Sequence, residues 1–134
     1  MPNVAEIEGV GEVSAAKLAE AGVKSVDGLL EMGGTAAGRQ ELEAKTGLAG
    51  ANILKWVNHA DLFRINGVGP QFAELLEASG VDSVPELAQR NAANLATKMA
   101  EVNEAKNLAN RVPSESEVEK WVEEAKSLPR MVSH

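Results

Sequence analysis

Apolar residues recur along this chain every three to four positions, the spacing that places them on one face of a helix. No stretch alternates apolar and polar residues in the way that a half-buried strand does. The pattern therefore predicts an all-α chain without a sheet. The clearest helical run lies in residues 50–64 and contains Ile53, Leu54, Trp56, Val57, Ala60 and Phe63.

Capping residues indicate where these helices begin and end. Ser25, Thr35 and Ser83 can each accept a hydrogen bond from the free amides of a following helix, and a glycine often ends one. Ser114 and Glu117 have the spacing of a capping box. These signals predict at most one helical turn before the first glycine pair, and then helices over residues 12–21, 26–32, 36–46, 50–64, 70–79, 84–90, 92–110 and 115–127.

Residues 7–30 and 65–88 are two copies of one pattern, aligned without a gap at a spacing of 58 residues. A second similarity relates Trp56 to Trp121 at a spacing of 65 residues. We therefore expect two tandem units, residues 1–64 and 65–134, packed as one compact domain. The matched positions are mostly glycine and apolar: Ile7/Ile65, Gly9/Gly67, Val10/Val68, Gly11/Gly69, Ala15/Ala73, Leu18/Leu76, Gly22/Gly80, Val23/Val81, Ser25/Ser83, Val26/Val84 and Leu29/Leu87.

Each copy carries a Gly-Val-Gly segment directly before a helix, at residues 9–11 and 67–69. A tight turn between helices needs backbone angles that side chains obstruct, and glycine removes the obstruction. The central valine can then point into the core. We expect Gly67→Val or Gly69→Val to cost ~1–3 kcal/mol through backbone strain.

The pattern G-h-G-x-x-x-A-x-x-L, with h apolar, resembles the helix-hairpin-helix motif. The segments GRQELEAKTGL, KWVNHADLFRINGVG and WVEEAKSLPR resemble a widespread bacterial family of unknown function made of paired helix-hairpin-helix units. This similarity covers nearly the whole chain. It implies an all-α fold of two tandem helix-hairpin-helix (SAM-like) repeats packed as a compact helical domain.

In helix-hairpin-helix proteins the hairpin amides and the next helix N-terminus contact a nucleic-acid phosphate, because both present positive charge to an anion. The second turn is the better candidate, since the first lies among the carboxylates of Glu6, Glu8 and Glu12. For both turns the alternative is a purely structural role. The candidate residues are Arg64, Gly67, Val68, Gly69 and Gln71 in the second copy, and Gly9 and Gly11 in the first.

The net charge of −7 opposes nucleic-acid binding, because phosphate neutralisation by basic residues supplies most of that affinity. A strip of Arg90, Lys98, Lys106 and Arg111 could assist the second turn, but the glutamates among them favour a mixed, solvated helix face. Neither a secretory signal nor a run of ~18 apolar residues is present, so we expect a cytoplasmic protein that does not enter a membrane.

Little in the chain suggests catalysis, a metal or a cofactor, and none is expected. There is no cysteine, and the only histidines are His59 and the terminal His134. We expect His59 to be at the surface or half-buried rather than a metal ligand. Trp56 and Trp121, at equivalent positions, are expected to pack against their units rather than stack on bases.

Two functions follow from these observations. The first is a non-enzymatic adaptor or scaffold that contacts an unidentified protein partner or a second copy of itself. The second is binding of DNA or RNA backbone without sequence preference, mainly through the second turn. An exposed apolar patch on the two tryptophan helices would favour the adaptor, and a positive patch centred on Gly69 would favour nucleic acid.

Overall fold

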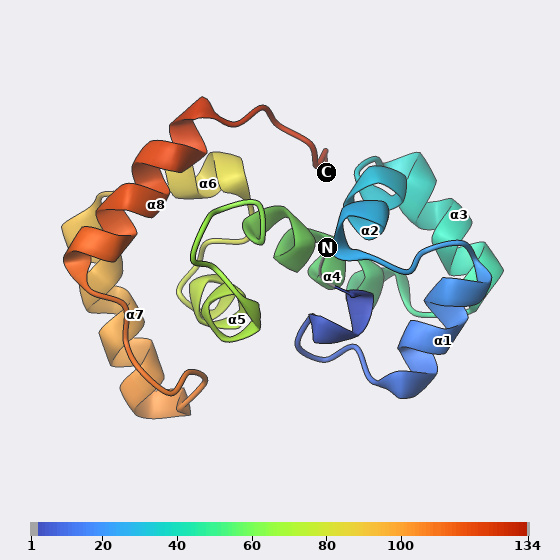
Figure 1. Ribbon diagram of the computed structural model, residues 1–134, viewed down its shortest axis with the longest axis horizontal. Coiled ribbons are helices and arrows are strands. Elements are labelled where there is room, and N and C mark those ends of the chain that lie inside the picture. Colours follow the sequence, from blue (N-terminus) through green and yellow to red (C-terminus); the bar gives the residue numbers. More distant parts are fainter. Residues whose placement is uncertain (1–2, 134) are drawn as a thin grey trace. The chain divides into compact units, whose positions relative to one another are not determined.

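The computed structural model describes residues 3–133, so Met1, Pro2 and His134 lie outside the described residues (Figure 1). The described chain contains a short 3-10 helix and eight α-helices, and its only β-type pairing is an isolated bridge between Asn3 and Ser25. The expected all-α class is confirmed. The elements are η1 (Val4–Glu6), α1 (Glu12–Glu20), α2 (Val26–Gly33), α3 (Ala36–Thr46), α4 (Gly50–Leu62), α5 (Pro70–Ala78), α6 (Val84–Ala88), α7 (Ala92–Lys106) and α8 (Glu115–Ser127).

The described residues divide into two compact units, residues 3–61 with 131–133 and residues 62–130. The division falls near the end of α4, three residues before the expected boundary at 64/65. Residues 131–133 lie with the first unit, whereas the sequence pattern had assigned them to the second. This assignment differs because Ser133 forms its hydrogen bonds with Gly34, which follows α2, and with Arg39 on α3.

Side-chain caps form where the sequence placed them. Ser25 accepts from the amide of Gly28 at 2.9 Å, Thr35 from that of Gly38 at 3.0 Å, and Ser83 caps α6 in the same way. At the start of α8, Ser114 and Glu117 form the expected capping box. The starts of these helices are therefore fixed by local hydrogen bonds.

The end of α7 differs from the expectation. We expected this helix to continue to residue 110, but it ends at Lys106, and Asn107 adopts the left-handed conformation with φ of 53°. Asparagine tolerates this conformation better than most residues, so it can end a helix as glycine does. The Asn103 side chain then bonds both the amide and the carbonyl of Ala109, at 2.8 and 3.0 Å, which holds the following loop.

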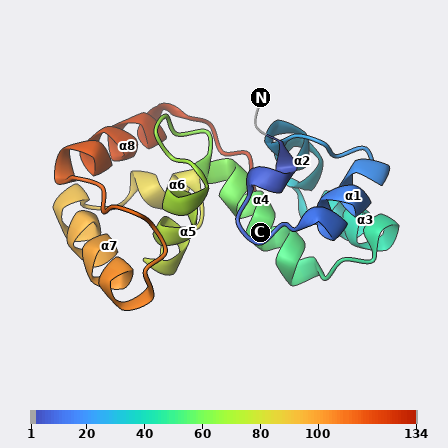
Figure 2. The same ribbon diagram turned by 60° about the horizontal axis from the view of Figure 1, so that its bottom comes forward.

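In the second unit, α8 packs against α6 and α7, and α5 packs against α7; α7 and α8 lie side by side in both views (Figures 1 and 2). In the first unit, α3 packs against α1 and α2. No described helix has the length and apolar character needed to cross a membrane. The core of the second unit includes Leu62, Ile65, Val68, Leu75, Leu76, Val81, Leu87, Leu95, Met99, Val118 and Trp121.

The backbone repeats its geometry at the sequence spacing of 58. The φ angles of Gly9 and Gly67 are 91° and 92°. The amide of Val10 donates to the carbonyl of Ile7 at 3.1 Å, and the equivalent bond from Val68 to Ile65 has the same length. The sequence similarity therefore corresponds to one local backbone conformation used twice.

Candidate functional site at the second glycine turn

Only the first glycine of each Gly-Val-Gly segment needs to be glycine for conformational reasons. Gly67 has a φ of 92°, which L side chains rarely adopt. Gly69 has a φ of −104° and Gly11 a φ of −81°, both ordinary extended backbone, and a Cβ on either residue would meet nothing within 4 Å. The expected strain in Gly69→Val is therefore wrong, because a valine at residue 69 would fit the backbone.

A tryptophan lies against each of the positive-φ glycines. A Cβ added to Gly67 would lie 3.3 Å from Nε1 of Trp121, and one added to Gly9 would lie 3.5 Å from Nε1 of Trp56. Both indoles are buried, as the packing interpretation expected. The two sequence similarities, at spacings of 58 and 65, thus describe one contact made in each unit.

Three polar groups around the second turn are bonded within the protein. The amide of Asn66 donates to Oε1 of Glu124 at 3.0 Å, and Nη2 of Arg64 donates to the carbonyl of Pro129 at 2.7 Å. Oε1 of Gln71 accepts from the amide of Asn110 at 3.0 Å. Glu124 and Arg64 thus hold the turn to the end of α8, while Gln71 holds the loop after α7.

This arrangement limits what the second turn can bind. The Glu124 carboxylate places negative charge on the turn, where a phosphate would be repelled. Val68 is buried, as expected for the central valine, while Gly67 is exposed and Gly69 is half-buried. The turn therefore presents two glycines and an acidic side chain to an incoming ligand.

The first turn is exposed at Gly9 and Gly11, and Val10 is buried as its counterpart is. Of the three expected carboxylates, that of Glu6 accepts from the amide of Asn3 at 2.7 Å and completes a capping box at η1. The side chain of Glu6 is therefore used to cap a helical turn.

Two rings and a guanidinium group lie in contact beside the second turn. The Phe72 ring lies 5.3 Å from that of Trp121, and the Arg111 guanidinium lies 5.0 Å from the centre of the Phe72 ring. Arg111 also forms a bidentate pair with Glu117, with two bonds of 2.8 Å. This pair connects the loop before α8 to the first turn of α8.

Hydrogen bonds to the Glu117 carboxylate lower its pKa from 4.5 to about 2. The bonds from Arg111 contribute most, and the bond from the amide of Ser114 comes next. Because the folded pKa is depressed, the stabilisation is present above pH 4.5 and is lost as the pH falls from there towards about 2. Thermal melts should show that Glu117→Gln lowers the melting temperature at pH 7 and flattens its decline below pH 4.5. Glu119→Gln, an exposed position on the same helix, serves as the control, and the same flattening there would contradict the assignment.

The basic residues of the second unit do not form a free cationic strip. Arg90 pairs with Glu86 at 3.6 Å and donates to the carbonyl of Ser79, while Arg111 is held by Glu117. Lys98 and Lys106 are exposed on α7. These basic side chains therefore lie among acidic ones or in solvent, as expected from the sequence for a helix face of mixed charge.

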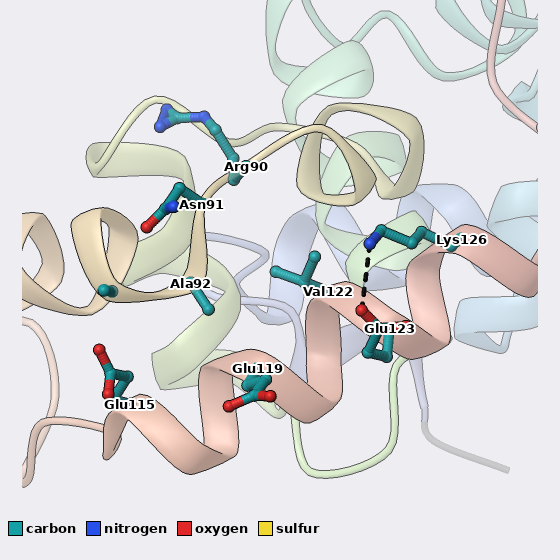
Figure 3. Close-up of a pocket in the computed structure, with 9 residues that line it drawn as sticks. Arg90, Asn91, Ala92, Glu115, Glu119, Val122, Glu123 and Lys126 are labelled. Atoms are coloured by element: carbon teal, nitrogen blue, oxygen red, sulfur yellow. Dashed lines mark hydrogen bonds and ion pairs between the residues drawn. The ribbon is translucent and has the colours of Figure 1, made fainter.

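A shallow groove of about 390 Å³ lies between the start of α7 and α8 (Figure 3). Its α8 side carries a row of glutamates, of which Glu123 pairs with Lys126 at 3.0 Å. The tryptophan helix α8 therefore shows charged side chains to solvent here, and the apolar patch that would favour an adaptor is not found on this face. The lining residues are Arg90, Asn91, Ala92, Ala93, Glu115, Glu119, Val122, Glu123 and Lys126.

His59 is completely buried, and so is Asp61. The expectation of a surface or half-buried histidine is wrong, because the helix face that carries Trp56 and Ala60 is buried around His59 as well. Among residues 3–133, no group of three or more acidic or histidine side chains could hold a metal ion. His134 lies outside the described residues.

Several residues that shape the site could not be found from sequence patterns. Glu124 lies three positions after Trp121, and this spacing on α8 is the only sequence signal that relates it to the turn. Asn110 and Pro129 supply main-chain groups, which carry no sequence signal at all. Arg39, which is buried in the first unit, looks like any surface arginine of an amphipathic helix.

A comparison with models of protein families found a match. A family model described as "Domain of unknown function (DUF4332)" matches residues 8–128, nearly the whole chain. Comparisons with curated proteins and with solved structures gave no match.

Proposed function

We propose that this chain, which belongs to the DUF4332 family of domains of unknown function, is a non-enzymatic helical module that binds another protein. We further propose that it is built from two tandem helix-hairpin-helix units of the SAM-like type. The φ angles of Gly9 and Gly67, 91° and 92°, and the matching hydrogen bonds around them support the repeat. A cytoplasmic location remains an expectation from the sequence.

The observation that carries the proposal is the difference between two equivalent helices. α5 buries Ala73, Leu75 and Leu76 in its unit, whereas α1 buries only Leu18. On α1, Val13 has 70% of its surface exposed, the most of any large apolar residue among residues 3–133. An exposed aliphatic side chain supports a partner surface when further exposed apolar atoms lie next to it.

The surroundings of Val13 extend this surface. Ala16 is exposed one turn further along α1, and a shallow groove beside it is lined by Asn3, Val4, Ala15, Ala16, Ala19 and Lys24. Small side chains allow a partner helix or loop to approach the α1 backbone closely. We call Val13, Ala16 and this groove the α1 surface.

Charge also favours a protein partner over nucleic acid. Both units carry more acidic than basic side chains, nine against five in the first and eleven against eight in the second. Glu124 lies on the turn that the nucleic-acid hypothesis requires. A polyanion would meet repulsion from both units.

Photo-crosslinking tests the proposal. A benzoylphenylalanine in place of Val13 should give a discrete adduct in cell extract, whereas the same group at Gln71, the equivalent exposed position of α5, should give none. An adduct of twice the chain mass would identify a second copy as the partner. Ala16→Glu should reduce the adduct about tenfold or more, because a desolvated carboxylate costs more than the ~1.4 kcal/mol that tenfold represents. Equal labelling at both positions, or no adduct, would contradict the proposal.

One observation favours nucleic-acid binding as the second candidate. The N-cap residues of α1 and α5 are Gly11 and Gly69, which supply no side-chain cap. The first-turn amides of the two helices therefore have no side-chain acceptor and are open to an anion, except at Pro70, which has no N–H. Fluorescence anisotropy with labelled DNA and RNA at ~50 and ~200 mM salt tests it. Micromolar binding that weakens steeply with salt and is lost in Arg64→Glu would establish this function and displace the first.

A further inference from the structure

Residues 131–133 belong to the first unit and are bonded to it through the main chain of Ser133. Val132 is 2% exposed. The amide of Ser133 donates to the carbonyl of Gly34 at 2.8 Å, and its carbonyl accepts from Nη2 of Arg39 at 2.6 Å. Residues 131–133 therefore combine one buried aliphatic side chain with a main chain that is bonded through both its amide and its carbonyl.

The Arg39 side chain is buried although it carries a positive charge. It is only 9% exposed, and its Nη1 donates to the carbonyls of Gly33 and Gly34 at 2.9 and 3.1 Å. The carbonyl of Ser133 is the third acceptor of the Arg39 guanidinium, so all three acceptors are uncharged carbonyl oxygens. None of the ion pairs among the described residues includes Arg39. Buried guanidinium groups are normally paired with a carboxylate, because an uncompensated charge is costly away from water.

Two glycines shape the surface beside Arg39. A Cβ on Gly34 would lie 2.5 Å from the carbonyl oxygen of Met131, so only glycine lets the segment approach this closely. A Cβ on Gly33 would lie 2.6 Å from Cγ2 of Val57, so Gly33 is needed for α2 to pack on α4. We define Gly33, Gly34 and Arg39 as the Arg39 groove.

We propose that the Arg39 groove binds the C-terminal carboxylate of an extended peptide, with an aliphatic side chain in the place of Val132. Residues 131–133 occupy the groove in the absence of such a peptide. A carboxylate in the place of the Ser133 carbonyl would neutralise the buried guanidinium and form a charge-assisted bond, roughly twice as strong as a neutral one. The groove is separate from the α1 surface, so the proposal goes beyond the function given above and does not depend on it.

The test compares two fluorescent peptides with the sequence of residues 127–133, one with a free carboxylate and one with a C-terminal amide. The protein is the full chain with Val132→Gly and Ser133→Pro, which removes the aliphatic side chain and the amide that hold its own segment. The free acid should bind at least about tenfold more tightly than the amide by anisotropy. Adding Arg39→Met should remove this difference, and the wild-type chain should bind the acid more weakly, because its own segment competes at high effective concentration.

Equal affinity for acid and amide, or no binding of either by a variant that remains helical by circular dichroism, would overturn the proposal. If the double variant does not fold, the single variant Val132→Gly, in which the competing segment is weakened, is labelled with ¹⁵N and titrated with the same peptides. The acid alone should then move the amide signals of Gly33, Gly34 and Ser133, and unchanged signals up to millimolar peptide would overturn the proposal equally. Crosslinking at Val13 should be unaffected by Arg39→Met, so failure here and failure of the α1 surface are distinguishable.

Discussion

Replacing Trp121 by alanine should lower the free energy of unfolding by about 3–5 kcal/mol, the range for removing a large aromatic side chain from a core. Trp121 is 3% exposed and contacts Phe72 in a tilted arrangement, and the Arg111 guanidinium lies over the Phe72 ring. It also lies against Gly67. The substitution would therefore leave a cavity at the point where α8, the second turn and α5 meet.

Urea unfolding followed by circular dichroism measures this loss. Lys120→Ala, the exposed neighbour on α8, should change the free energy by less than about 0.5 kcal/mol. The chain has two tryptophans and no tyrosine, so fluorescence of Trp121→Ala reports Trp56 and the first unit alone. A loss below about 1 kcal/mol would show that Trp121 is not part of a packed core.

Replacing Gly67 by valine should cost about 2–4 kcal/mol. A β-branched residue with the φ of 92° found at Gly67 is strained by about 1–3 kcal/mol. Its Cβ would also press on the indole of Trp121, and overpacking of this kind adds about 1 kcal/mol.

The matched control is Gly69→Val, two residues further along the same turn. Its φ of −104° suits any residue and a Cβ there has free space, so the cost should be below about 1 kcal/mol. Thermal and urea unfolding of both variants give the comparison. Equal destabilisation by the two substitutions would show that the turn needs glycine for a reason other than its positive φ.

The sequence determined the helical class, the starts of most helices and the internal repeat. These features depend on hydrogen bonds between residues a few positions apart, such as Ser25 with Gly28 and Ser114 with Glu117, and on apolar spacing. The repeat also identified the two tryptophans as equivalent. Local signals of this kind can be interpreted from a single chain because both partners lie in the same short segment.

The surroundings of the second turn were decided by the tertiary structure. The sequence pattern placed Arg64 and Gln71 at the turn as ligand contacts, but it did not show that each bonds the main chain of a distant residue. Those partners are 65 and 39 positions away, and Glu124 reaches Asn66 across 58 positions. The requirement for glycine at residue 67 but not 69 likewise depends on φ angles that the pattern does not encode.

The Arg39 groove and the burial of His59 are decided only by the tertiary structure. Arg39 meets Ser133 across 94 positions and contacts its main chain alone, so neither residue type signals the contact. His59 is buried because of where its helix lies in the folded chain. Side chains of these types more often lie at the surface, and only the packing of distant segments can show that these two do not.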